Sequence, residues 1–234
     1  MSISRRMILT CLAFCTGSVC FASAIVNGGF ETGDLTGWSR TYSGSGTVGC
    51  DNEFHAANTG LGCQSLPGPF DGSYSAYSSI NVTGAGSSAG DYLTQTLVLP
   101  STPVSSAILS WENVFAYSSG GSVDDVTLLV QLSSPLITNY VVNDPSGASP
   151  SPTWTPEQWN LTSYVNANLG STVTLEFEIS AAETSSATQT IAAGIDDVSF
   201  TSTSAVPEPS GLLFTAGGCF LLVAVNRLRR QRCV

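Results

Sequence analysis

The sequence predicts an all-β domain, a single jelly-roll β-sandwich, and three observations support this expectation. Between residues 25 and 205, short apolar segments alternate with loops rich in Gly, Ser, Asn and Pro. The clearest segment, 172–179, has an apolar side chain at every second position, which is the period of a strand with one buried face. No part of residues 25–205 shows a sustained helical period. Short strands separated by turn residues are typical of a sandwich.

The N-terminal residues are typical of a secretory signal peptide. Arg5 and Arg6 precede an apolar stretch, 7–21, which is followed by Ala22-Ser23-Ala24. A basic start, an apolar middle and an A-x-A end predict cleavage after Ala24. We therefore expect residues 1–24 to be a signal peptide and residues 25–205 to form one domain, which is large enough for one well-packed core.

The expected elements of the domain follow from the same alternation. A short apolar strand at 25–26 leads into a turn-rich loop between Phe30 and Trp38, both of which are expected in the core. Residues 107–117 and 123–132 are expected to pair as a hairpin. The other expected strands and loops are short strands within the loop region 42–68, strands at 74–77, 92–99, 136–142, 159–165, 172–179 and 191–200, and loops at 81–90 and 181–189.

The charge of the predicted domain is strongly negative. The sequence has no lysine, and residues 25–205 contain one arginine, Arg40, against 16 acidic residues, which is a formal net charge of −15. Binding of nucleic acid is not expected, because phosphate contacts require Lys and Arg. Divalent cations and neutral ligands are compatible with this charge, which also favours solubility outside the cell.

Two cysteines remain in the predicted domain, Cys50 and Cys63. An exported domain with two cysteines predicts one disulfide bond. It would close a loop of about 14 residues and contribute on the order of 3 kcal/mol to stability in the chain-entropy model. A metal site is the alternative, but His55 is the only histidine available to complete it.

Three signals follow one another in the last 29 residues, 206–234. They are Val206-Pro207-Glu208-Pro209, an uncharged apolar segment from Gly211 to Val225, and an Arg-rich stretch at 227–232. The two prolines cannot continue a helix or a central strand and mark a boundary between structural units. A helix of 15 residues spans about 22 Å, which is short for a bilayer core that needs about 20 residues. The arginines after it are expected in the cytoplasm, so that the domain lies outside.

This tail resembles the PEP-CTERM protein-sorting signal. The resemblance covers the motif 206–209, the apolar segment 211–225 and the basic stretch 227–232, in that order. It implies processing by an exosortase, a membrane-embedded enzyme of Gram-negative, often biofilm-forming bacteria that make exopolysaccharide. The protein would be exported through the inner membrane, held there transiently, and then found at the cell surface or outside. An ordinary C-terminal membrane anchor is the alternative.

The two ends of the domain resemble the first and last strands of galactose-binding-like jelly rolls, a superfamily with many carbohydrate-binding modules. The residues that carry the resemblance are Asn27-Gly28-Gly29-Phe30-Glu31, Asp71-Gly72-Ser73-Tyr74, Leu93-Thr94-Gln95-Thr96-Leu97 and Ile195-Asp196-Asp197-Val198-Ser199-Phe200. In such modules the first and last strands meet and often share a structural calcium ion. The resemblance implies a Ca²⁺ site formed by the carboxylates of Glu31 and Asp197 and the carbonyl of Gly29, since calcium prefers oxygen ligands. The alternative is that Glu31 caps a turn and the aspartates border a strand in solvent.

The sequence predicts no catalytic site. His55 is the only histidine, no G-x-S-x-G motif is present, and Glu176 and Glu178 lie on the ordinary polar face of a strand. Glycan binding would require exposed aromatic side chains, of which Trp154 is the first candidate because it lies in a loop. Core packing is the alternative for each of the candidates Tyr74, Tyr77, Trp111, Tyr117, Trp154 and Trp159.

The expected function is therefore that of a non-catalytic surface or matrix protein associated with extracellular polysaccharide, with glycan binding as its activity. A structural surface protein with no specific ligand is the alternative, and a secreted glycoside hydrolase ranks last. The sequence does not identify the ligand.

Overall fold

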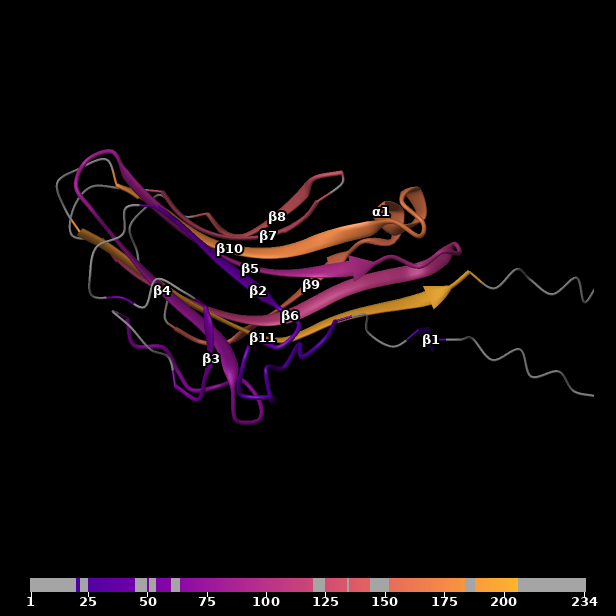
Figure 1. The fold of residues 1–234 in the computed structure, drawn as a ribbon, viewed down its shortest axis with the longest axis horizontal. Coiled ribbons are helices and arrows are strands. Elements are labelled where there is room, and N and C mark those ends of the chain that lie inside the picture. The colour runs from indigo at the N-terminus through magenta and orange to yellow at the C-terminus, as the bar shows by residue number, and fades with distance from the viewer. Residues whose placement is uncertain are drawn as a thin grey trace, which may run out of the picture. The chain divides into compact units, whose positions relative to one another are not determined.

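The computed structural model describes residues 20–21, 25–44, 50, 54–59, 64–119, 125–133, 135–143, 152–183 and 188–205. They all belong to one compact unit, Cys20–Ala205. Two antiparallel sheets form this unit, so the all-β sandwich expected from the sequence is confirmed. Figure 1 shows the two sheets as two layers.

The first sheet has the strand order β3-β4-β11-β6-β9, and β1 pairs with the C-terminal half of β11. The short strand β1 lies within the predicted signal peptide. The strands of this sheet are β1 (Cys20–Phe21), β3 (His55–Ala57), β4 (Ser75–Thr83), β6 (Val104–Ser119), β9 (Thr155–Asn160) and β11 (Thr188–Ser204).

The second sheet has the strand order β2-β5-β10-β7-β8. Its central strand, β10, pairs along its length with β5 and along most of it with β7. The strands are β2 (Ser39–Gly44), β5 (Ser87–Val98), β7 (Asp125–Leu132), β8 (Ile137–Asn143) and β10 (Thr172–Glu183).

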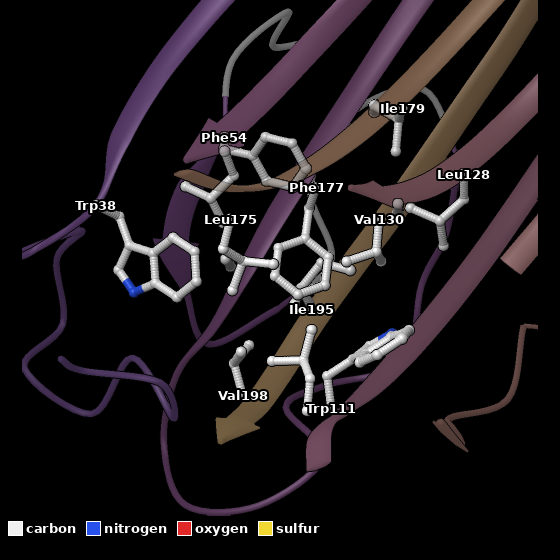
Figure 2. Close-up of a cluster of buried hydrophobic side chains, with 14 of the residues drawn as sticks. Trp38, Phe54, Trp111, Leu128, Val130, Leu175, Phe177, Ile179, Ile195 and Val198 are labelled. Carbon is white, nitrogen blue, oxygen red and sulfur yellow. The ribbon is translucent and has the colours of Figure 1, made fainter. Parts of the chain in front are cut away.

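The core lies between the two sheets and is made by the alternating apolar residues that the sequence predicted. On β10, Val173, Leu175, Phe177 and Ile179 are at most 1% exposed. Figure 2 shows Phe177 between Trp111 of β6 and Leu175, with Ile195 of β11 below it. The expected core positions of Phe30 and Trp38 are confirmed, since their side chains are 0% and 8% exposed. Aromatic rings of both sheets therefore pack in one core, with Phe177 in ring contact with both Trp38 and Trp111.

Four sequence predictions are wrong in detail. The expected hairpin of 107–117 with 123–132 does not form, because β6 lies in the first sheet and β7 in the second. Residues 81–90 are not one loop, since β4 and β5 continue to a tight turn around Gly84 and Gly86. The predicted strand 159–165 is replaced by the end of β9 and a short helix, α1 (Thr162–Ala167). Residues 25–26 form no regular strand.

The loop from Ile25 to Trp38 is instead fixed by one glutamine side chain. The Gln95 amide accepts a hydrogen bond from the Val26 N–H at 2.8 Å and donates one to the Val26 carbonyl at 2.9 Å. Gln95 lies on β5 and is 5% exposed. Its side chain thus makes the two bonds that a neighbouring strand would make, which explains why a glutamine stands in the middle of an otherwise apolar face.

Candidate functional site

The two ends of the domain meet, as the sequence predicted, at an irregularity in β11. The Val198 N–H donates a hydrogen bond to the Gly28 carbonyl at 3.0 Å. Between Asp196 and Ser199 the register of β11 against β6 shifts, and Asp197 takes a φ of 47°. An extra residue in a strand with a left-handed backbone is a β-bulge, which redirects its side chain. The bulge points Asp197 out of the regular face of the sheet and towards Gly29.

Acidic side chains gather at this bulge. An oxygen of Asp197 lies 3.3 Å from the position that a Cβ would occupy on Gly29. Burial raises the pKa of Asp197, and the negative charges of Asp71 and Glu31 raise it further. The structure therefore brings Gly29, Glu31 and Asp197 into one region, together with Asp71.

Glu31 also caps a turn. Its carboxylate accepts hydrogen bonds from the N–H groups of Ser73 and Tyr74, at 2.9–3.0 Å. Gly72 has a φ of 61°, and a Cβ there would overlap the Glu31 carboxyl group. The turn therefore needs a glycine, because of the positive φ and because a side chain would clash with Glu31. Within the described part of the chain, no group of three or more His, Cys, Asp or Glu side chains is arranged to hold a metal ion.

Asp196, the neighbour of Asp197, is buried on the outer side of β11. Its carboxylate accepts hydrogen bonds from the Ser75 hydroxyl at 2.6 Å and the Asp197 N–H at 2.8 Å. Burial raises its pKa to about 6 despite these bonds, which act in the opposite direction. A carboxyl group whose pKa is higher in the folded state stabilises the fold when protonated, so its contribution is lost as the pH rises through about 6.

We expect Asp196→Asn to flatten this pH dependence in the presence of a chelator. The amide keeps polar contacts with Ser75 and Asp197 but carries no charge at any pH. Between pH 4.5 and 7.5, the free energy of unfolding of the wild type should fall relative to that of the variant by about 2 kcal/mol. Urea unfolding at both pH values measures this difference. Parallel pH profiles for the two proteins would contradict the assignment.

A cleft of about 520 Å³ lies at the bulge itself, along the β6–β9 edge of the first sheet, and Gly29 is among its lining residues. Carboxyl groups of Glu112, Glu157 and Asp197 line it. Burial raises the pKa of Glu112, and the charges of Asp197, Asp196 and Glu157 raise it further. Among the described residues, Trp111 is the only aromatic side chain lining this cleft, and it is 2% exposed and packs in the core. The cleft thus offers acidic groups without an aromatic surface.

The outer face of the second sheet offers acidic groups together with an aromatic side chain. Register pairs place Tyr92 of β5 opposite Thr41 of β2 and opposite Glu178 of β10. The neighbouring row consists of Ser39, Thr94, Glu176, Gln131 and Thr138. These side chains alternate with the buried ones, so they lie on the face that does not contact the core.

Tyr92 lies along its own strand, over Gly90. A Cβ on Gly90 would be 2.7 Å from the Tyr92 hydroxyl oxygen and 3.0 Å from its Cζ atom, so only glycine leaves room for the ring in this position. Tyr92, Glu178, Ser180, Thr127 and Ser43 line a hollow of about 290 Å³. Burial raises the pKa of the Tyr92 hydroxyl, and the charges of Glu178, Glu176 and Asp91 raise it further.

The aromatic residues that the sequence suggested for glycan binding do not lie on this face of the second sheet. Tyr77, Trp111 and Tyr117 are at most 2% exposed, so core packing is correct for them. Trp154 is half-buried, and its indole N–H donates to the Gly68 carbonyl at 2.9 Å while its ring contacts Tyr77 and Phe70. Its ring therefore covers a second, smaller apolar cluster. Tyr92 was not a candidate. The alternation along β5 could have identified it, because its neighbour Leu93 is buried and Tyr92 therefore lies on the other, polar face of the strand.

Other predicted features fall at the edge of the described residues or beyond it. Cys50 is disulfide-bonded, and Cys63 lies outside the described residues. The motif 206–209, the apolar segment 211–225 and the signal-peptide residues other than 20–21 also lie outside them. No helix in the described part of the chain is long and apolar enough to cross a membrane.

No protein-family model matches the chain, and no curated protein matches it. Among solved structures, TmCBM61 in complex with β-1,4-galactotriose is 13% identical, with 76% of this chain and 97% of that chain covered and a TM-score of 0.42. A structure described for the carbohydrate-binding modules of the β-sandwich superfamily is 11% identical, with 73% and 59% covered and a TM-score of 0.45. The enzymatically active domain of bacteriophage CBA120 tailspike protein 4 is 14% identical, with 77% and 21% covered and a TM-score of 0.40. Because these identities are so low, function has to be inferred from the side chains of this chain.

Proposed function

We propose that the domain is a non-catalytic, jelly-roll glycan-binding module, and that the glycan binds on the outer face of the second sheet. The observation that carries this proposal is Tyr92, whose ring lies with its hydroxyl end over Gly90 in a hollow lined by hydroxyl and carboxyl groups. A sugar ring has apolar C–H faces and a rim of hydroxyl groups. An aromatic ring surrounded by hydrogen-bonding side chains complements both.

The rest of the face extends this hollow into a polar surface. Serine and threonine hydroxyls on β2, β5, β7 and β10 can donate or accept hydrogen bonds without requiring a charged ligand. The hollow itself is at the small end of ligand pockets, which begin at about 300 Å³. An open face around a small hollow suits one ring held in the hollow and further units of a chain lying across the sheet.

We expect Tyr92→Ala to weaken retention of the exopolysaccharide of the producing organism at least about tenfold, or about 1.4 kcal/mol. Gly90→Ala should have a similar effect, since the added methyl displaces the free end of the Tyr92 ring without moving the backbone. Affinity electrophoresis in polysaccharide gels measures both. Phe70→Ala is the control, because Phe70 is 45% exposed and its ring contacts Trp154 rather than the second sheet. Equal retention of wild type and Tyr92→Ala would refute the site.

A structural Ca²⁺ ion at the bulge of β11 is part of the proposal. Glu31 and Asp197 would supply carboxylate oxygens and Gly29 a carbonyl oxygen. These hard ligands suit calcium. Burial and then the charges of Asp71 and Glu31 raise the pKa of Asp197, and a cation would relieve this repulsion. Such an ion would tie the Ile25–Trp38 loop to the last strand and stabilise the sandwich without taking part in glycan binding.

We expect 1 mM Ca²⁺ to raise the melting temperature at pH 7.5 relative to a chelator, and Asp197→Asn to remove most of this increase. Differential scanning calorimetry measures the shift. Glu176→Gln is the matched control, since it removes the same charge from β10 in the second sheet and should leave the calcium effect intact. A melting temperature that does not respond to calcium would mean that Glu31 acts only as the cap of its turn.

The proposed setting is outside the cell, in an exopolysaccharide or biofilm matrix. The basis for this is the sequence of residues 1–24 and 206–234, with processing of the tail by an exosortase as the proposed route. Replacing Pro207, Glu208 and Pro209 by alanine should leave the tail uncut, and mass spectrometry of the exported protein detects this. An unchanged mature mass would instead favour an ordinary membrane anchor or no processing.

A further inference from the structure

The hollow around Tyr92 is lined by the carboxyl group of Glu178, and the described residues place no Lys or Arg side chain on its face of the sheet. Glu176 and Glu178 are two residues apart on β10 and therefore point to the same side. The only Lys or Arg between residues 25 and 205 is Arg40. Its register partner is Leu93, on the core side of β5, and its guanidinium donates to the Phe54 carbonyl at 3.0 Å. Within the described part of the chain, no Lys or Arg side chain therefore lies beside these two glutamates.

The two glutamates have different surroundings. Glu176 accepts a hydrogen bond from the Gln131 amide on β7. Glu178 lies directly opposite Tyr92 and lines the hollow, with Ser180 as its hydrogen-bonding neighbour on the same strand. Burial raises the pKa of Glu178, and the charge of Glu176 raises it further. A carboxylate in this position is stabilised most by a ligand that brings a positive charge.

We propose that the hollow selects glycans that carry free amino groups, with the sugar ring on Tyr92 and its ammonium group bound by Glu178. This inference rests on the proposed glycan-binding function and adds the class of ligand. Tyr92 provides the surface that any sugar ring can use, whereas Glu178 distinguishes one sugar from another.

Charge chemistry gives the expected order of ligands. An ammonium group has three donors and forms short hydrogen bonds to a carboxylate, roughly twice as strong as those between neutral groups. Acetylation of the amine removes the positive charge and leaves one donor. A uronic acid would place a third carboxylate beside Glu176 and Glu178, which is unfavourable in a partly buried site. Amino glycans should bind best, neutral glycans less well, and acidic glycans least.

The test compares two hexasaccharides that differ only in acetylation, hexa-glucosamine and hexa-N-acetylglucosamine, in titrations of the full-length chain at pH 6 and low salt. We expect the free amine to bind at least tenfold more tightly. Glu178→Gln should remove most of this preference. The matched control, Glu157→Gln, removes the same charge from β9 in the other sheet and should retain the preference. Raising the salt to 0.5 M should reduce it, because mobile ions screen exposed charges.

The outcomes separate this inference from the function on which it rests. If both hexasaccharides bind equally and Tyr92→Ala weakens both, the inference is wrong and the glycan-binding function stands. If neither they nor the host exopolysaccharide bind, the function itself is wrong. If the preference for the amine persists in Glu178→Gln but is lost in Glu157→Gln, the amine binds in the acidic cleft at the β6–β9 edge, and the assignment to Tyr92 and Glu178 is overturned.

Discussion

Gly28→Ala should destabilise the protein by at least about 3 kcal/mol, the largest effect that we expect from a single methyl group. A Cβ on Gly28 would overlap the carbonyl oxygen of Val198 and lie 3.0 Å from a side-chain carbon of Ile25. The same two backbones are joined by the hydrogen bond from the Val198 N–H to the Gly28 carbonyl. Because the clashing atom belongs to the backbone of a core strand, the added methyl group fits only if the first loop separates from the bulge of β11.

Urea unfolding measures this loss as a lower midpoint. Gly68→Ala is the matched control, because the nearest atom to its added Cβ would be the Asn58 carbonyl oxygen at 3.8 Å, an ordinary contact. The control should lie within about 0.5 kcal/mol of the wild type. Similar midpoints for the two alanine variants would show that the first loop is not held against β11.

Gln95→Met should cost about 2–3 kcal/mol, although methionine has nearly the same size and shape. The substitution removes two hydrogen bonds at once and leaves the Val26 N–H and carbonyl without their partner. Each lost bond contributes about 1 kcal/mol, and partly buried backbone groups without partners add to this cost. The loss comes from detaching the Ile25–Trp38 loop, so hydrogen exchange of the Val26 amide should accelerate in step with the loss of stability.

The control for this variant is Gln158→Met on β9, where the glutamine side chain is exposed. Gln158→Met should leave the free energy of unfolding nearly unchanged, since no buried backbone group depends on the Gln158 side chain. If Gln95→Met is as stable as this control, water replaces the glutamine at Val26 and the side chain does not fix the loop.

Local alternation along the chain predicted most strands but could not predict their partners. On β10 the buried and exposed positions follow from the sequence, because a residue's side of a strand depends only on whether its position is odd or even. The placement of β7 beside β10 rather than β6 depends on contacts between residues about 45 positions apart, such as Gln131 and Glu176. Proximity in the sequence favoured the wrong hairpin.

Short elements were missed for a related reason. The helix α1 spans only Thr162–Ala167 and has one buried side chain, Val165, so it has no amphipathic period to detect. Its position is fixed by tertiary contacts instead, among them the Ala107 N–H, which donates to the Thr162 hydroxyl at 3.0 Å. The turn around Gly84 was absorbed into a predicted loop because small polar residues of the two flanking strands resemble loop residues.

The sequence by itself predicted the sandwich class and the buried face of β10, and its resemblance to galactose-binding-like jelly rolls implied that the Gly28-Gly29 and Asp196-Asp197 segments meet. It is also the sole basis for the expected signal peptide and sorting tail. Only the tertiary structure decided that the Gln95 side chain makes the hydrogen bonds to Val26 that a neighbouring strand would otherwise make. It also decided that Tyr92 and Glu178 face each other on two neighbouring strands that are far apart in the chain. The physical reason is that the buried face of a strand is set by local alternation, whereas a binding face requires the pairing register of several strands.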